Sequence, residues 1–169
     1  MNEKEEYTFE TVWKSIQELS EKLKKTDEIV NGIAKSNGDM AEQTIYNSLE
    51  RDMTFAGVEF EDIDKNRKRK SKSLKLEGEY DVVMENGNTI AIIETKYKVR
   101  KKDVSELLTQ KLDSFRKLFP YYSDYKILLG VGGMSFDDDA IKEAKENGIG
   151  IIKIIGDKVE YHTEGIKTY

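Results

Sequence analysis

The chain has 169 residues, 36% charged and 37% hydrophobic, with a formal net charge of −5 at pH 7, so it accommodates one domain and an appended segment but hardly two full domains. The absence of cysteine excludes disulfides and thiolate-bound metals, and a single histidine excludes a histidine-based zinc cluster, which leaves oxygen ligands for Mg²⁺ or Mn²⁺. Without a signal segment or roughly 18 consecutive apolar residues, we expect a cytoplasmic protein that does not contact a membrane.

Apolar residues near the N-terminus alternate at spacings of three and four, which is the heptad pattern of a coiled coil. Trp13 and Ile29 widen the stripe, so a trimer, a tetramer or packing on the protein's own domain stays open beside a dimer. We predict a coiled-coil helix over residues 1–36, with self-association through residues 9–33, and a second domain over residues 37–169. The apolar seam consists of Phe9, Val12, Ile16, Leu19, Leu23, Val30 and Ile33, with Thr26 at one seam position.

A second helix is expected directly after the first. Gly38 is suited to end the first helix with a left-handed cap, and Asp39 is suited to cap the next one. This second helix should cover residues 40–52. The following stretch, residues 59–72, changes abruptly from acidic to basic, and we expect it to be irregular.

Two strands and a tight turn are predicted in the middle of the chain. Residues 74–84 and 89–97 should form an antiparallel hairpin around a type I′ turn at Asn86-Gly87. A two-residue turn pairs Glu85 with Asn88, which fixes the register of every later pair.

The remaining chain alternates helices and strands. A helix with one apolar face begins near Asp103 and stops before Pro120, the only proline. The predicted order then is a strand over 125–131, a helix over 136–147 closed by Gly148, a strand over 149–155 and an edge strand over 159–163. This βαβ pattern implies buried parallel strands and an α/β fold.

The predicted register gathers charged residues on one face of the hairpin. Side chains alternate along a strand, so Asp81, Glu94 and Lys96 share a face, and Glu79 lies directly opposite Glu94. Asp81 is diagonal to Glu94 at about 7–8 Å, a separation that one cation can bridge. The alternative is a solvated strand face with cross-strand ion pairs, such as Glu77 with Lys96.

These residue types match metal-assisted hydrolysis of a phosphodiester. Two carboxylates fix a hard cation against a phosphate oxygen, the cation lowers the pKa of a water molecule, and a lysine stabilises the developing charge. We therefore predict Asp81, Glu94 and Lys96 as catalytic residues, with Glu79 as a further participant at the metal.

Asp81 followed by Glu94-Thr95-Lys96 on a hairpin, then a helix and a βαβ return, resembles the PD-(D/E)XK nuclease superfamily over about residues 38–155. It is also similar to microbial members in which a coiled coil precedes the nuclease-like domain. The resemblance implies a restriction-endonuclease-like mixed sheet flanked by helices, Asp81 and Glu94 as metal ligands, the Thr95 carbonyl as another, and Lys96 as the catalytic lysine. It also implies a role for Glu42, which a capping box with Asp39 explains equally well.

Two basic stretches flank the predicted site. One enters the first strand and the other leaves the second, so a phosphate backbone would be attracted to that side, although such runs are more often mobile loops. The residues predicted to contact nucleic acid are Lys65, Arg67, Lys68, Arg69, Lys70, Lys72, Lys98, Arg100, Lys101 and Lys102.

The sequence thus favours a Mg²⁺-dependent or Mn²⁺-dependent nuclease that acts on DNA as a homo-oligomer. The alternative is a non-catalytic module of the same fold that binds nucleic acid, or partner proteins through its coiled coil. The glycines from Gly130 to Gly133 lack the spacing of a phosphate-binding loop, so we expect no small-molecule cofactor.

Overall fold

A computed structural model describes residues 8–169, and residues 1–7 of the predicted coiled-coil segment lie outside the described part. The chain divides into two compact units, Met1–Asn37 and Gly38–Tyr169.

Helix α1 runs without interruption from Phe9 to Asp52, so the predicted break at Gly38 is wrong. A glycine inside a helix costs only about 1 kcal/mol, whereas a break leaves unsatisfied backbone groups at two new ends. Asp39 is therefore inside the helix and caps nothing.

The described part of the first unit is formed by the N-terminal part of α1, whose apolar stripe is exposed. The rings of Phe9 and Trp13 stack with their centroids 6.3 Å apart. The helices of residues 8–169 include none with the length and apolar character that a membrane span needs. The exposed apolar side chains here are Phe9, Val12, Trp13, Ile16, Leu19, Leu23, Ile29, Val30 and Ile33.

The second unit is built on a six-stranded mixed sheet in the order β3-β4-β5-β6-β7-β8. Strands β5, β6 and β7 are parallel, and the outer pairs are antiparallel. The strands are β3 (Asp62–Ser71), β4 (Leu76–Glu85), β5 (Thr89–Val99), β6 (Lys126–Phe136), β7 (Gly150–Ile155) and β8 (Lys158–His162), with a small separate hairpin of β1 (Thr54–Phe55) and β2 (Val58–Glu59). This confirms the predicted α/β class, a mixed sheet flanked by helices and preceded by a long helix.

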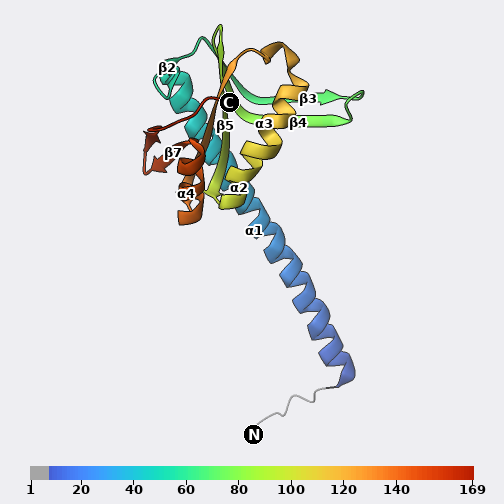
Figure 1. Ribbon diagram of the computed structural model, residues 1–169. Helices are drawn as coiled ribbons and strands as arrows, with labels where there is room; N and C mark the ends of the chain where they lie inside the picture. The colour runs from blue at the N-terminus through green and yellow to red at the C-terminus, as the bar shows by residue number, and fades with distance from the viewer. Residues whose placement is uncertain (1–7) are drawn as a thin grey trace. The chain divides into compact units, whose positions relative to one another are not determined.

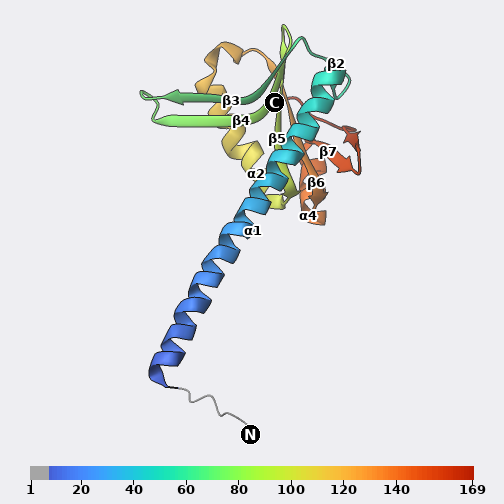
Figure 2. The same cartoon turned by 180° about the vertical axis from the view of Figure 1, so that it is seen from behind.

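Helices cover both faces of this sheet. Ala41, Ile45 and Leu49 of α1 pack in one core with Val82 and Ile93 of the sheet (Figure 2). The opposite face is covered by the remaining helices (Figure 1), which contribute the second core. They are α2 (Lys101–Glu106), the π-helix η1 (Leu107–Lys111), α3 (Leu112–Leu118), the short 3₁₀ helix η2 (Pro120–Tyr122) and α4 (Asp138–Asn147).

The C-terminal half agrees closely with the sequence-based expectation. Val104, Leu107, Phe115 and Leu118 are buried, as the apolar face of the predicted helix requires. Gly148 closes α4 in the left-handed conformation with φ +66°. Strands β7 and β8 lie where the two C-terminal strands were predicted.

The basic run forms strand β3, so the prediction of an irregular stretch there is wrong. Charged residues have weak strand propensity, but pairing with a neighbouring strand overrides it. Nine residue pairs join β3 to β4, from Asp62↔Glu85 to Ser71↔Leu76. The charged side chains of β3 thereby lie on an ordered hairpin.

The turn between β4 and β5 also differs from the prediction. Glu85 pairs with Ile90 rather than Asn88, because the Asn86 side chain accepts hydrogen bonds from the backbone of Asn88 and Thr89 and closes a longer loop. A type I′ turn needs positive φ at both central residues, and neither Asn86 nor Gly87 has one. The register shifts by two residues, which keeps the alternation of side chains along the paired part of the ladder, from Val82 to Glu85.

Candidate active site

Strand β4 changes direction at Asp81. Tyr80 belongs to the core under α3, whereas Val82 belongs to the core under α1. On the neighbouring strand Asn66, which lies level with Asp81, has φ +53°. A positive φ is unusual for a residue other than glycine and bends the strand locally. The β3–β4 hairpin therefore leaves the sheet at Asp81.

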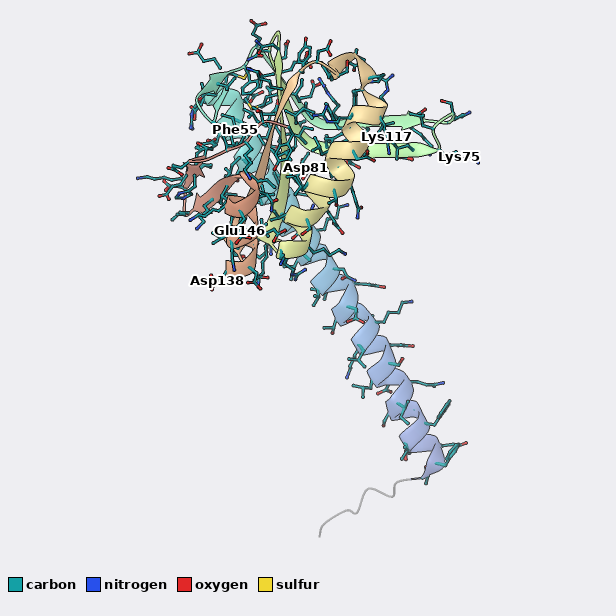
Figure 3. The ribbon with its side chains drawn as sticks, viewed as in Figure 1. Phe55, Lys75, Asp81, Lys117, Asp138 and Glu146 are labelled. Carbon is teal, nitrogen blue, oxygen red and sulfur yellow. The ribbon has the colours of Figure 1, made fainter. Side chains whose placement is uncertain are left out.

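The bend separates β4 from β5 beside the predicted site residues. The last pair of the β4–β5 ladder is Val82↔Ile93, one residue away from both Asp81 and Glu94. Figure 3 shows Asp81 within the body of the domain and Lys75 at the far tip of the hairpin. Asp81 and Glu94 thus lie where two strands begin to diverge.

The Asp81 carboxylate is fixed to strand β5. Its Oδ2 accepts a hydrogen bond from the Thr95 backbone N–H at 2.7 Å and another from the Thr95 hydroxyl at 3.0 Å. Thr95 is buried. The two hydrogen bonds hold Asp81 next to Glu94 without engaging the carboxylate of Glu94.

Glu94 is a buried carboxylate with two lysine partners. The residue is 7% exposed, and burying a charge is costly unless it is paired. Oε1 accepts a hydrogen bond from Lys96 Nζ at 2.8 Å, and Oε2 lies 3.1 Å from Lys111 Nζ. Burial acts to lower the pKa of Lys96, but the charge and hydrogen bond of Glu94, helped by Asp81 and Asp103, outweigh it and raise the pKa. Lys96 is therefore an ammonium at neutral pH.

Lys111 was not predicted from the sequence. It ends the π-helix η1, its Nζ donates a hydrogen bond to the Glu79 carbonyl, and it lies 5.5 Å from the centre of the Tyr80 ring. One signal was present, because Lys111 follows the buried Leu107 by four residues and so borders the apolar stripe of the helix.

Two other predicted site residues have different partners. The prediction that Glu79 faces Glu94 is wrong, since the β4–β5 ladder ends before it and the Glu79 carboxylate lies 3.0 Å from Lys68. Glu42 accepts a hydrogen bond from the side chain of Asn66 at 2.9 Å and lies 3.3 Å from Lys65. Glu42 therefore contacts the bend of β3 rather than Asp81 itself.

A small pocket opens beside Glu94. Oε2 of Glu94 is buried and, among the described residues, accepts no hydrogen bond, since the geometry toward Lys111 satisfies the ion-pair distance only. Residues 8–169 contain no group of three acidic, histidine or cysteine side chains arranged for a metal. Mg²⁺ needs only one or two carboxylates beside water and phosphate oxygens, and Asp81 and Glu94 are two carboxylates on neighbouring strands that could supply such oxygens. The pocket is lined by Glu94, Lys96, Asp103, Glu106, Leu107 and Lys111.

Strand β6 packs closely against the part of β5 that carries Lys96. Gly133 pairs with Lys96, and a Cβ built on Gly133 would lie 2.6 Å from the Lys96 carbonyl oxygen. Only glycine permits this approach. The backbone that carries Lys96 is therefore held against the centre of the sheet.

Most side chains predicted to contact nucleic acid have acidic partners within the domain. Arg67 is the least exposed, because Asp64, Glu85 and Tyr122 surround its guanidinium. Arg69 lies over the rings of Phe119 and Tyr121. The Arg100 backbone N–H donates to Asp103, and Lys72 is exposed beyond β3. The ion pairs are Lys65–Glu42, Lys68–Glu79, Lys70–Glu77, Lys98–Asp137, Lys101–Glu143 and Lys102–Glu106.

Two solved structures are similar to this chain. No protein-family model matches the chain, and no curated protein matches it. A repair endonuclease from Pyrococcus abyssi is similar in structure with a TM-score of 0.49 and 18% identity, over 67% of this chain and 46% of that chain. A solved protein of unknown function is similar with a TM-score of 0.42 and 18% identity, over 64% of this chain and 54% of that chain. The chain thus spans about half the length of each, and neither likeness assigns it an activity.

Proposed function

We propose that the chain is a metal-dependent nuclease that hydrolyses phosphodiester bonds of DNA. The observation that carries the proposal is the placement of Asp81, fixed by Thr95, beside the buried Glu94 and its partner Lys96. Asp81 and Glu94 would hold Mg²⁺ or Mn²⁺, with the Thr95 carbonyl as a further ligand. Such a cation supplies Lewis-acid stabilisation of phosphate charge and makes water more acidic.

The protein's own groups have separate tasks in this proposal. The two hydrogen bonds from Thr95 fix the Asp81 carboxylate, so little reorganisation is needed when a ligand arrives. Because its pKa is raised, Lys96 retains its proton. It therefore acts as a cationic donor to phosphate oxygens and orients water, and it does not act as a general base.

A cleavage assay tests the proposal. Purified full-length chain is incubated with plasmid, linear, branched and single-stranded DNA in Mg²⁺ or Mn²⁺. Cleavage should require Asp81 and Lys96, so Asp81→Ala and Lys96→Ala should each reduce the rate at least about 100-fold. Glu77→Ala is the matched control, because Glu77 is an exposed carboxylate of the same strand paired with Lys70. Absence of cleavage by the parent, or equal cleavage by all variants, contradicts the proposal.

A second candidate function is a non-catalytic module that binds nucleic acid or partner proteins. It is favoured by one observation, that Lys96 and Lys111 already neutralise Glu94. In that case DNA binding persists in Asp81→Ala and Lys96→Ala, falls steeply with salt concentration, and is accompanied by no cleavage in any variant.

We also propose that residues 9–33 mediate self-association. The heptad stripe is apolar and exposed, and Lys22 at a g position suits Asp27 at the following e position of a parallel second copy. Assembly would bring two or more sites together and allow a dimer to cut both strands. In light scattering, Leu19→Glu combined with Leu23→Glu should lower the mass to that of a monomer, whereas Lys24→Glu outside the seam should not. A parent that is already monomeric contradicts this proposal.

A further inference from the structure

Two lysines hold the Glu94 carboxylate in different ways. Lys96 lies two residues along the same strand and donates a hydrogen bond to Oε1. Lys111 comes from the π-helix and lies at ion-pair distance from Oε2, but the hydrogen bond that its ammonium donates goes to the Glu79 carbonyl. Oε2 consequently remains a buried acceptor without a hydrogen bond among the described residues. The contact of Glu94 with Lys96 is therefore a hydrogen-bonded ion pair, whereas its contact with Lys111 is an ion pair without a hydrogen bond.

The backbone of Lys111 is fixed while its side chain faces the pocket. The Ser114 hydroxyl donates to the Lys111 carbonyl at 3.0 Å and lies 2.7 Å from the Tyr80 hydroxyl. A five-residue π turn is rare and frequently occurs at functional sites, and here it ends at Lys111. The Lys111 side chain is 29% exposed, so its ammonium can move into solvent without leaving a buried charge on the lysine itself.

The same oxygen suits a cation. A divalent ion on Oε2 would meet the Lys111 ammonium within a few ångströms, where two positive charges repel strongly even at the effective dielectric constant of a protein surface. We infer that Lys111 is a positioning residue that holds the Glu94 carboxylate and competes with a divalent cation for Oε2. This inference rests on the proposed metal site at Asp81 and Glu94, and it adds a residue that weakens metal binding until the cation displaces it.

Calorimetric titration of the full-length chain with Mn²⁺ tests the competition. Lys111→Met keeps much of the length of the side chain and removes its charge. Mn²⁺ should therefore bind to this variant at least about tenfold more tightly than it binds to the parent. Lys111→Arg retains the charge and should restore an affinity near that of the parent. Lys117→Met is the control, because Lys117 is an exposed lysine of α3 paired with Asp113. The Mn²⁺ affinity of this variant should equal that of the parent. If Lys111→Met does not fold, Lys111→Gln replaces it with the same expected tightening.

The outcomes separate this inference from the proposed function. Unchanged or weaker Mn²⁺ binding by Lys111→Met, in a protein whose cleavage still depends on Asp81 and Lys96, overturns the competition and leaves the nuclease intact. Binding that appears only in Lys111→Met supports the competition even if the parent binds no Mn²⁺. Failure of both proteins to bind Mn²⁺ overturns the inference together with the metal site.

Discussion

The centre of the sheet and the β3–β4 hairpin carry the same kind of carboxylate–cation contact in very different surroundings. The side chain of Glu94 is 8% exposed between two lysines at the centre, whereas Glu79 and Lys68 on the hairpin are 50% and 65% exposed. Glu85 and Arg67, at 24% and 17%, are intermediate. Removing the partner of a buried charge strongly destabilises the fold, because the remaining charge is left without water or a counter-ion. An exposed ion pair contributes little to stability, because water can solvate either charge after its partner is removed. Burial therefore decides which contacts constrain the fold.

The difference also separates two functional roles. The central lysines pair with the buried Glu94, so in the proposed nuclease they would contact DNA only where a phosphate reaches the site. The hairpin lysines can exchange a carboxylate for a phosphate at little cost, since both states are solvated. Lys68 and Lys70 of this strand are paired with Glu79 and Glu77 in the structure, and their contact with DNA stays a prediction.

The largest effect on stability is expected from removing both central cations. Lys96→Met combined with Lys111→Met leaves the Glu94 carboxylate buried and unpaired, and should lower the free energy of unfolding by about 3–5 kcal/mol. Urea denaturation followed by circular dichroism measures the change. Lys98→Met combined with Lys117→Met is the control, since both lysines pair with exposed acids. Equal losses in the two double variants would show that burial of Glu94 has no special role.

A smaller effect is expected from the intermediate pair. Tyr122 donates a hydrogen bond to Glu85 and accepts one from Arg67, and burial together with the Glu85 hydrogen bond raises the pKa of Tyr122 to about 12. Tyr122→Phe should therefore lower the free energy of unfolding at neutral pH by about 1–2 kcal/mol.

The pH dependence of this variant has a defined sign. The pKa of Tyr122 is higher in the folded chain than the value of about 10 expected in the unfolded chain, so its stabilisation is present below about pH 10 and is lost as the pH rises toward 12. Denaturation curves across this range should converge for the parent and Tyr122→Phe. Tyr121→Phe is the control, because Tyr121 is 59% exposed. A constant difference between parent and Tyr122→Phe would contradict the assignment.

The regular parts of the fold could be predicted from the sequence because their signals are local. The apolar run of β6, the spacing of Val104, Leu107 and Phe115, and the cap at Gly148 each follow from a short stretch of chain. The faces of the hairpin were also predicted, since a register error of two residues preserves the alternation of side chains. Asp81 and Glu94 are therefore neighbours even though the turn was wrong.

The features that shape the candidate site depend on packing that is distant in sequence. The positive φ of Asn66 lies beside the point on β4 where Tyr80 and Val82, two residues apart, enter different cores. The π turn that presents Lys111 has no signal in a periodicity of 3.6 residues. The continuity of α1 through Gly38 likewise reflects the cost of new helix ends, which residue preferences do not express. A motif-based prediction therefore does not identify Lys111, although its position four residues after Leu107 places it beside the apolar stripe of the helix.

The smallest effect on stability is expected at the exposed hairpin pair, where an effect on DNA binding should appear instead. Lys68→Ala should change the free energy of unfolding by less than about 0.5 kcal/mol, because Lys68 and Glu79 are both well solvated. If β3 contacts DNA, the same variant should bind DNA more weakly and reduce the dependence of log affinity on log salt by about 0.9. Glu79→Gln should leave stability unchanged and strengthen binding, because it releases Lys68 for a phosphate. Fluorescence anisotropy of a labelled duplex over a range of salt concentrations measures both, and superimposable curves for the parent and the two variants would exclude this strand from the interface.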